Sequence, residues 1–318
     1  MKTIFPGWLS ESYQRFRLAR RLHRIWGVMI NIRKILCPVD FSPASENAVN
    51  YAIGLARSYK ARLKLLHVVS PIIPSAHEYS LNVGDLMKSM EEESEHLLEK
   101  LAEKAQAAGV AAATEVRIGN VHNEINRAIR VYKPDLVAMG THGRRGFERW
   151  FLGSTTERLL RHSPVPVLTI SPSMKSRDTL RRILVTTDFS EGTPDALNYA
   201  LSIARKNQAS LTLFHVLGEM RALTSATYRT SQIRRVKLDL LKTVPAKAKH
   251  WCTIQPRVEA GTPYDEILKI IGKEKVDLLV MNVHGKSMLD RALLGSTAER
   301  VVRAAACPVL LIPPMRRD

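Results

Sequence analysis

From residue 31 onward, short apolar runs alternate with longer segments in which apolar residues recur every three or four positions. Short apolar runs bounded by turn residues predict buried strands, and the longer period predicts amphipathic helices. The first half of the chain holds these predicted strands: Ile35–Val39, Ala61–Val69, Thr114–Ile118, Asp135–Met139 and Val165–Ile170. Helices are predicted between them, the first capped by Ser42 or Ser45 and the longest, Leu86–Ala108, ended by Gly109.

Candidate chemistry falls at the ends of several predicted strands. Strands that alternate with helices pair in parallel, with helices on both faces of the sheet. The ligand crevice of such a sheet lies beyond the carboxyl ends of its strands. Asp40 ends the first predicted strand, Val68 lies at the end of the second, and Gly140 ends the fourth. We therefore expect these residues to meet at one edge.

The second half of the chain repeats the first. Arg181-Arg-Ile-Leu-Val-Thr-Thr-Asp188-Phe-Ser190 matches the segment from Arg33 to Ser42, and Pro308–Ile312 matches Pro166–Ile170. Such self-similarity indicates one domain written twice. We predict an α/β protein with two tandem doubly wound parallel five-stranded sheets. Its expected parts are a first domain over 31–172, a linker over 173–180 and a second domain over 181–314.

A glycine loop follows the fourth predicted strand. Gly140-Thr-His-Gly143 is followed, after nine residues, by Gly153-Ser154-Thr155, which opens a predicted helix. With Glu157 three residues on, Ser154 fits a capping box. A strand, a glycine loop and a helix start form a phosphate-binding arrangement, because glycines let backbone N–H groups approach an anion. A lone loop of this kind is more often two ordinary turns, but this one recurs as Asn282-Val-His-Gly285 and Gly295-Ser296-Thr297.

Composition narrows the class of protein. The 318 residues suffice for two domains, and the formal net charge of +18 favours anionic partners or merely solubility. Three cysteines without a CxxC pair argue against a disulfide framework or a zinc site and are typical of a reducing compartment. No apolar run approaches the length of a membrane span. We expect a cytoplasmic location.

Residues 1–30 differ from the rest of the chain. Leu18, Leu22, Ile25 and Met29 fall at helical spacing, and arginines occupy the other face. This basic amphipathic pattern suits a segment lying on an anionic membrane surface. Two alternatives stay open: the protein starts at Met29 rather than Met1, or the helix packs on the body.

Each half resembles a domain of the universal stress protein family of the UspA type, and the whole chain resembles a tandem, UspE-like member. The resemblance covers nearly all of residues 31–314 and implies a Rossmann-like sheet of the adenine nucleotide alpha hydrolase-like (HUP) type. In the ATP-binding branch of the family the motif is glycine, two residues, glycine, nine residues, then glycine and serine or threonine. Gly140, Gly143, Gly153 and Ser154 match this motif completely.

The resemblance implies that ATP, with or without Mg²⁺, binds mainly in the first half. Asp40 would contact the ribose or adenine side, Val68 the adenine edge, and the glycine loop the phosphates, with Arg144 neutralising charge. The implied nucleotide-binding residues are Pro38, Asp40, Val68, Gly140, Gly143, Arg144, Gly153, Ser154 and Thr155.

The second half departs from the motif. Asn282 replaces the first glycine, and its side chain is expected to occupy space that a phosphate needs; Thr186 replaces Pro38. We therefore expect weaker or absent binding there. The degenerate second site would comprise Asp188, Val216, Asn282, Gly285, Gly295, Ser296 and Thr297.

No paired carboxylates, metal cluster or nucleophile with a base can be assembled from the sequence, so no catalytic or metal-binding residue is predicted. His142 and His284, beside the loops, could support at most slow ATP hydrolysis and are better explained as structural residues.

Three functions compete. The first, which we prefer, is a stress-response module in which ATP alters the binding of protein partners. The second is a scaffold independent of nucleotide, in which the last strands, Val165–Ile170 and Val309–Ile312, pair the two halves as a pseudo-dimer and the chain can form a homodimer. The third is binding of nucleic acid or an anionic membrane surface through the N-terminal arginines and these basic residues: Arg229, Arg234, Arg235, Lys237, Lys242, Lys247 and Lys249.

Overall fold

The computed structural model describes residues 30–71, 83–141, 152–174, 179–218, 225–285 and 294–314. The predicted N-terminal amphipathic segment, the alternative start at Met29, the histidine His142, and the site residues Gly143 and Arg144 lie outside these ranges. Within the described part, no helix is long and apolar enough to cross a membrane. The chain divides into two compact units, one of which holds residues 31–178 and the other residue 179 onward.

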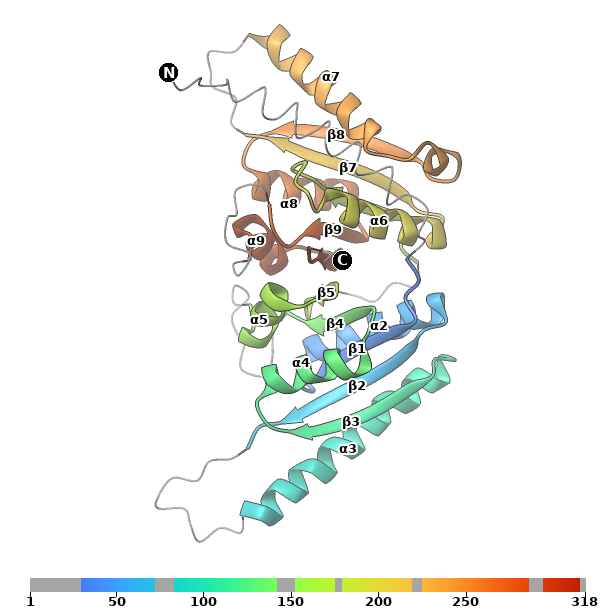
Figure 1. Cartoon of the computed structure of the whole chain (residues 1–318), viewed down its shortest axis with the longest axis vertical. Helices are drawn as coiled ribbons and strands as arrows, with labels where there is room; N and C mark the ends of the chain where they lie inside the picture. Colours follow the sequence, from blue (N-terminus) through green and yellow to red (C-terminus); the bar gives the residue numbers. More distant parts are fainter. Residues whose placement is uncertain are drawn as a thin grey trace. The chain divides into compact units, whose positions relative to one another are not determined.

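The first unit is a parallel sheet with the strand order β3-β2-β1-β4-β5 (Figure 1). Its elements are β1 (Lys34–Val39), α2 (Pro43–Tyr59), β2 (Arg62–Val69), α3 (Val83–Ala107), β3 (Ala112–Ile118), α4 (Val121–Tyr132), β4 (Leu136–Gly140), α5 (Ser154–His162) and β5 (Val167–Ile170). Two of the predicted helix ends are confirmed, one at the start of α2 and one after α3. Ser42 is the N-cap of α2, and Gly109 follows the end of α3 with a φ of 76°.

The second unit repeats this topology with the order β8-β7-β6-β9-β10. Its elements are β6 (Arg182–Thr186), α6 (Thr193–Asn207), β7 (Ser210–Leu217), α7 (Ala226–Lys242), the 3-10 helix η1 (Ala246–His250), β8 (Ile254–Ala260), α8 (Pro263–Glu274), β9 (Leu278–Asn282), α9 (Ser296–Ala304) and β10 (Val309–Ile312). The predicted α/β fold of two tandem parallel sheets is therefore confirmed.

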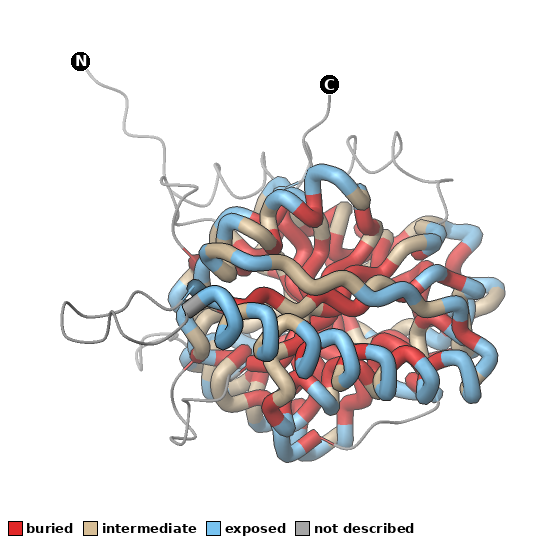
Figure 2. The backbone as a smooth tube through the Cα atoms, turned by 90° about the horizontal axis from the view of Figure 1, so that it is seen from below, coloured by how far each residue is buried: buried red, intermediate tan, exposed pale blue. Residues whose placement is uncertain are grey.

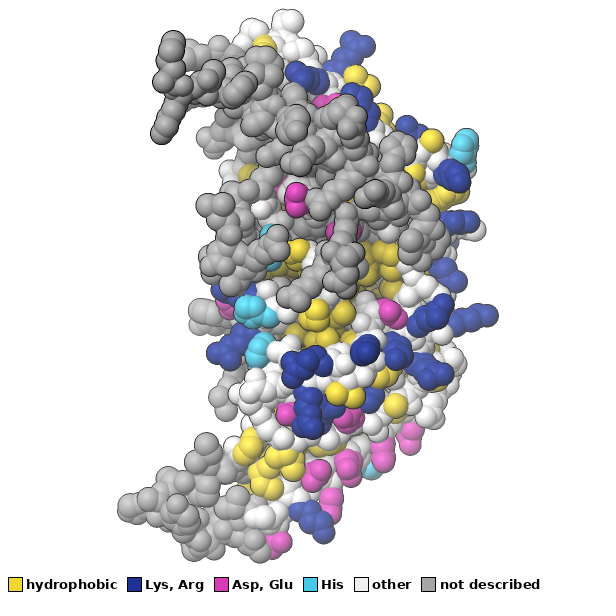
Figure 3. Space-filling view, in the orientation of Figure 1, with side chains coloured by type: hydrophobic (Ala, Val, Ile, Leu, Met, Phe, Trp, Pro, Cys, Tyr) yellow, Lys and Arg dark blue, Asp and Glu magenta, His cyan; other side chains and the backbone are white. Residues whose placement is uncertain are grey.

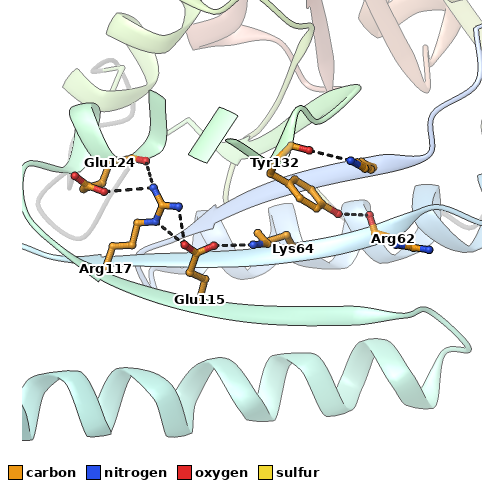
Figure 4. Close-up of polar contacts among 7 residues, drawn as sticks. Arg62, Lys64, Glu115, Arg117, Glu124 and Tyr132 are labelled. Atoms are coloured by element: carbon orange, nitrogen blue, oxygen red, sulfur yellow. Dashed lines mark hydrogen bonds and ion pairs between the residues drawn. The ribbon is translucent and has the colours of Figure 1, made fainter. Parts of the chain in front are cut away.

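The strand order places a switch point between β1 and β4, and between β6 and β9. β1 pairs with β2 on one side (Lys34 beside Arg62) and with β4 on the other (Ile35 beside Leu136). Because parallel crossovers are right-handed, connections that leave in opposite directions put their helices on opposite faces. In Figure 4, α3 and α4 accordingly lie on opposite sides of the sheet. In sheets with such a switch point, ligands bind in a crevice beyond the carboxyl ends of the strands.

Burial follows position in the sheet. Every residue of β4 and β5 is buried, as expected for strands covered on both faces. The residues of β3 are half-buried or exposed, and so are those of β8 apart from the buried Val258. Figure 2 shows the buried residues gathered in the interior and the exposed ones on the outer elements. The fully buried side chains of β1 and β2, including Ile35, Leu36, Leu63 and Leu65, form the centre of the first core.

Charged side chains tie β3 to its neighbours (Figure 4). The Glu115 carboxylate accepts hydrogen bonds from Lys64 of β2 (2.7 Å) and from Arg117 of β3 (2.6 Å). Arg117 also donates to the carbonyl oxygen of Glu124 in α4 (3.2 Å) and lies 3.3 Å from its carboxylate. Charged side chains at a sheet edge also discourage pairing with another chain.

This network predicts an acid-sensitive contribution to stability. Burial disfavours the charged form of Glu115, but the hydrogen bonds and charges of Lys64 and Arg117 outweigh it, so the Glu115 pKa lies below its ordinary value of 4.5. A lowered folded-state pKa stabilises the fold above the unfolded-state pKa, and this contribution is lost as the pH falls through the folded-state value. We expect Glu115→Gln to lower the urea midpoint at pH 7 and to weaken its fall on acidification.

The matched control is Glu92→Gln. Glu92 lies 3.7 Å from Lys88 in an exposed pair, and such pairs contribute little. Equal pH dependence of the wild-type and Glu115→Gln midpoints would contradict the assignment.

Candidate functional site

Asp40 lies at the carboxyl end of β1, where the chain turns into α2. Its Oδ1 accepts hydrogen bonds from the Ser42 N–H (3.0 Å) and hydroxyl (2.6 Å), and the same hydroxyl caps α2 by accepting from the Ser45 N–H (3.3 Å). In the second half, Asp188 accepts from the Ser190 N–H (2.9 Å). Each carboxylate is therefore held in place by the helix start beside it.

The residue after each aspartate adopts a strained conformation. Phe41 and Phe189 both have a φ of 60°, which bulky residues rarely adopt. Their rings contact those of His67 and His215, with centroids 4.6 and 4.9 Å apart. Strain of this kind persists only where surrounding contacts enforce it, and it concentrates at functional sites.

Each histidine also bonds to the main chain at the end of the first strand of its own half, His67 at the end of β1 and His215 just after β6. Nδ1 of His67 lies 2.7 Å from the Val39 carbonyl oxygen, and Nδ1 of His215 lies 2.7 Å from that of Thr187. Because a carbonyl oxygen only accepts, Nδ1 carries the proton in both rings. The histidines thus fix the turns that carry the aspartates.

Gly140 ends β4 against the first turn of α2. A Cβ added there would lie 2.8 Å from the main-chain carbon of Ala44 and 2.9 Å from its Cβ, closer than real contacts allow. Glycine at this position is therefore required for the packing of β4 on α2. The resemblance had implied close approach of a phosphate instead, and that role stays a prediction.

Asn282 occupies the equivalent position in the second half, and its side chain turns toward α6. Gly192 replaces Ala44 there, and a Cβ on Gly192 would lie 3.0 Å from the Asn282 side chain. In the amide orientation that satisfies both groups, Asn282 donates to the Gly192 carbonyl oxygen (3.0 Å) and accepts from the Thr193 N–H (3.2 Å). The amide therefore caps the start of α6, and the expectation that this side chain occupies space that a phosphate needs stays a prediction.

The predicted capping box at Ser154 was wrong. Gly153 is the N-cap of α5 and makes no side-chain cap bond, so Ser154 is the first helical residue, and Glu157 pairs with Arg161 instead. Gly295 starts α9 in the same way. Helices that begin on glycine leave first-turn N–H groups without a side-chain acceptor, which suits an anion.

Each of these helix starts is tied to the end of the fourth strand. The N–H of Gly153 donates to Thr141 (2.9 Å), and the Thr156 hydroxyl donates to the Gly140 carbonyl oxygen (2.9 Å). The N–H of Gly295 donates to Val283 (3.1 Å). In each half, the helix start and the aspartate therefore lie at the same edge of the sheet, the one formed by the carboxyl ends of its strands.

In the second half this edge encloses a cavity of about 290 Å³. This volume is near the lower limit for small-molecule pockets. Phe214, Ile267 and Met281 are apolar lining residues. The lining also includes every predicted residue of the second site: Asp188, Val216, Asn282, Gly285, Gly295, Ser296 and Thr297.

Gly285 lies against Asp188, the aspartate that lines this cavity. A Cβ on Gly285 would lie 2.9 Å from Oδ2 of Asp188. The second glycine of the motif thus makes room for a carboxylate that faces the cavity. Among the described residues, no group of three or more His, Cys, Asp or Glu side chains could hold a metal ion.

The described residues of the first site occupy the matching edge of the first sheet. Pro38 and Asp40 lie at the end of β1, Val68 lies in β2, Gly140 ends β4, and Gly153, Ser154 and Thr155 open α5. Sequence reasoning missed Pro263 and Ile267, which contribute to the cavity from α8. It also missed that Gly192 replaces Ala44 opposite Asn282, which alignment of the two halves reveals.

This exchange predicts that the two positions are not interchangeable. Gly140→Asn should destabilise the first half by about 1–3 kcal/mol, because the side chain must enter a packed contact. Asn282→Gly should cost about 0.5–2 kcal/mol, because α6 loses its cap. Urea unfolding measures both, with Asn282→Asp as the control that keeps the acceptor for Thr193. Wild-type stability of Gly140→Asn would contradict the packing argument.

Comparison with known proteins agrees with this geometry. Residues 31–171 and 179–313 each match the model of the universal stress protein family. The chain is 26% identical over 292 residues to a universal stress protein of Mycolicibacterium smegmatis, covering 88% of this chain and 97% of that protein. It is 35% identical over 147 residues to one from Methanocaldococcus jannaschii, covering 45% and 84%.

A solved structure resembles the chain along most of its length. The crystal structure of a universal stress protein from Archaeoglobus fulgidus superposes with a TM-score of 0.67 at 25% identity, covering 89% of this chain and 99% of that one. With two matched domains that together span most of its length, the chain belongs to the universal stress protein family.

Proposed function

We propose that each half binds an adenine nucleotide at the carboxyl edge of its sheet, and that ATP, with or without Mg²⁺, is the ligand. The observation that carries the proposal is the second-half cavity, which gathers every predicted residue of that site around one space. The first half keeps the complete glycine motif, and we propose it as the principal site. Because the Asn282 amide bonds to the start of α6, we propose that the second half binds nucleotide as well.

The chemistry of the edge suits the parts of a nucleotide. Apolar side chains such as Ile267 and Met281 offer a surface for the base. Asp188 and its counterpart Asp40 can accept hydrogen bonds from ribose hydroxyls. The starts of α9 and α5 offer main-chain N–H groups and the positive end of the helix dipole to phosphates.

The proposed activity is binding rather than efficient catalysis. Nucleotide at this edge would contact the turn after the first strand of each half, which leads into α2 or α6. Occupancy could therefore change the surface that each half offers to protein partners in a stress response. Pairing of the two halves through their last strands, formation of a homodimer and a cytoplasmic location stay predictions.

Isothermal titration calorimetry of the intact chain with ATP tests the proposal. Gly153 and Gly295 have φ, ψ values of −59°, 138° and −58°, 132°, which valine also adopts, so the fold should survive substitution. We expect about two equivalents bound by the wild type, about one by Gly153→Val or Gly295→Val, and none by the double variant. No binding by the wild type would overturn the proposal and favour the scaffold.

If the carboxylates of Asp40 and Asp188 bind the ribose, the affinity for ATP should depend on the ribose hydroxyls. Asn at position 40 or 188 keeps an oxygen that can accept from the adjoining serine but lacks the charge. Since hydrogen bonds to charged groups contribute about 1.5–3 kcal/mol, combining Asp40→Asn with Asp188→Asn should weaken ATP binding about tenfold or more. The same double variant should bind 2′,3′-dideoxy-ATP, which lacks both ribose hydroxyls, about as tightly as the wild type does. An equal loss for both ligands would show that the aspartates act on the fold instead.

A further inference from the structure

Helices α3 and α7 occupy the same place in the two repeats but carry opposite charge. Each follows the second strand of its sheet, and each packs on the third, α3 on β3 and α7 on β8. Residues 83–107 contain seven acidic and three basic side chains, whereas residues 226–242 contain one acidic and five basic side chains. Figure 3 shows acidic side chains gathered along α3 and basic ones over α7.

The acidic charges of α3 form a stripe. Leu98, Ala102 and Ala105 are buried against the sheet. Positions three, seven and eleven residues apart lie on one side of a helix. An exposed side next to these buried residues carries four glutamates at this spacing: Glu92, Glu95, Glu99 and Glu103.

The basic charges of α7 form a matching stripe. Val236 and Leu240 are the buried residues of this helix. Arg234, Leu238 and Lys242 follow one another at four-residue spacing on its outer side, and all three are exposed. The 3-10 helix η1 extends the basic surface with two further exposed residues, Lys247 and Lys249. Leu238, with 54% of its surface exposed, gives this stripe an apolar centre.

We propose that the acidic stripe of α3 (Glu92, Glu95, Glu99 and Glu103) docks on the basic surface of α7 and η1 (Arg234, Lys242, Lys247 and Lys249) of a second copy of this chain. The argument is charge complementarity. In a chain of net charge +18, α3 is an acidic exception. Each copy therefore carries an acidic surface on α3 and a basic surface on the equivalent helix of the other repeat, α7.

The contact is heterologous, because two different surfaces meet, so it forms either a closed assembly or an open chain of copies. Exposed ion pairs are individually weak, so the association is weak and depends on concentration. Salt acts on it in two ways. The overall charge of the chain opposes the approach of two copies at low ionic strength. At about 0.1 M salt this repulsion is screened beyond roughly 10 Å, while touching pairs still attract.

Sedimentation velocity on the full chain tests the proposal with two reversed variants. The first carries Glu92→Lys, Glu95→Lys and Glu99→Lys, and the second carries Arg234→Glu, Lys242→Glu and Lys247→Glu. At 0.1 M NaCl we expect the wild-type sedimentation coefficient to rise with protein concentration, and the rise to disappear at 0.5 M. Each variant alone should lose the rise, because its two surfaces then share one sign.

An equimolar mixture of the two variants should regain the association, since opposite signs again face each other between copies. Circular dichroism and the ATP titration check that both variants keep their fold and the proposed site, which separates this proposal from the nucleotide-binding one. The proposal would be overturned if the sedimentation coefficient of the wild type did not depend on concentration. It would also be overturned if the mixture of the two variants did not associate. Binding of a 20-base-pair DNA duplex that the second variant loses, without any charge-dependent self-association, would assign α7 to nucleic acid instead.

Discussion

The contact between the end of the fourth strand and the first turn of the helix after the first strand governs the site in each half. At the switch point these two elements leave the sheet side by side, so whatever fills the space between them sets where the aspartate turn and the glycine loop lie. Ala44 against Gly140 fills it in the first half, and Asn282 against Gly192 fills it in the second. The same constraint is met by reciprocal changes, so both edges keep the same arrangement.

The fold, and the gathering of the predicted second-site residues around one cavity, could be predicted because both depend on regular patterns. Apolar periodicity gave the strands and helices, the repeat gave the tandem arrangement, and parallel topology brings Asp188 and Ser296 to one edge from opposite ends of the second half. Side-chain direction could not be predicted. Asn282 turns toward α6 because Gly192 leaves space, and Glu157 pairs with Arg161 because α5 starts at Gly153. The first outcome depends on a contact between distant segments, and the second depends on the residue at which the helix begins.

The repeats have diverged most on their outer surfaces. Lys64, Glu115 and Arg117 tie β2, β3 and α4 in the first half, whereas Arg257 lies 3.5 Å from Glu274 at the corresponding place in the second. Charge has likewise reversed between α3 and α7. By contrast, the strained Phe41 and Phe189 and their histidine partners are the same in both halves. The turns after β1 and β6 have thus kept their aspartate, phenylalanine and histidine contacts, while the charges of α3 and α7 have changed.

Hydrogen–deuterium exchange of the intact chain, with and without ATP, tests most directly the claim that each half carries a ligand site at its strand ends. The account predicts slower exchange in ATP at the first turns of α5 and α9 and at the turns after β1 and β6. Amides of β3 and β8, at the far edge of each sheet, should not change. Protection confined to α7, or no protection at any strand end, would contradict the account.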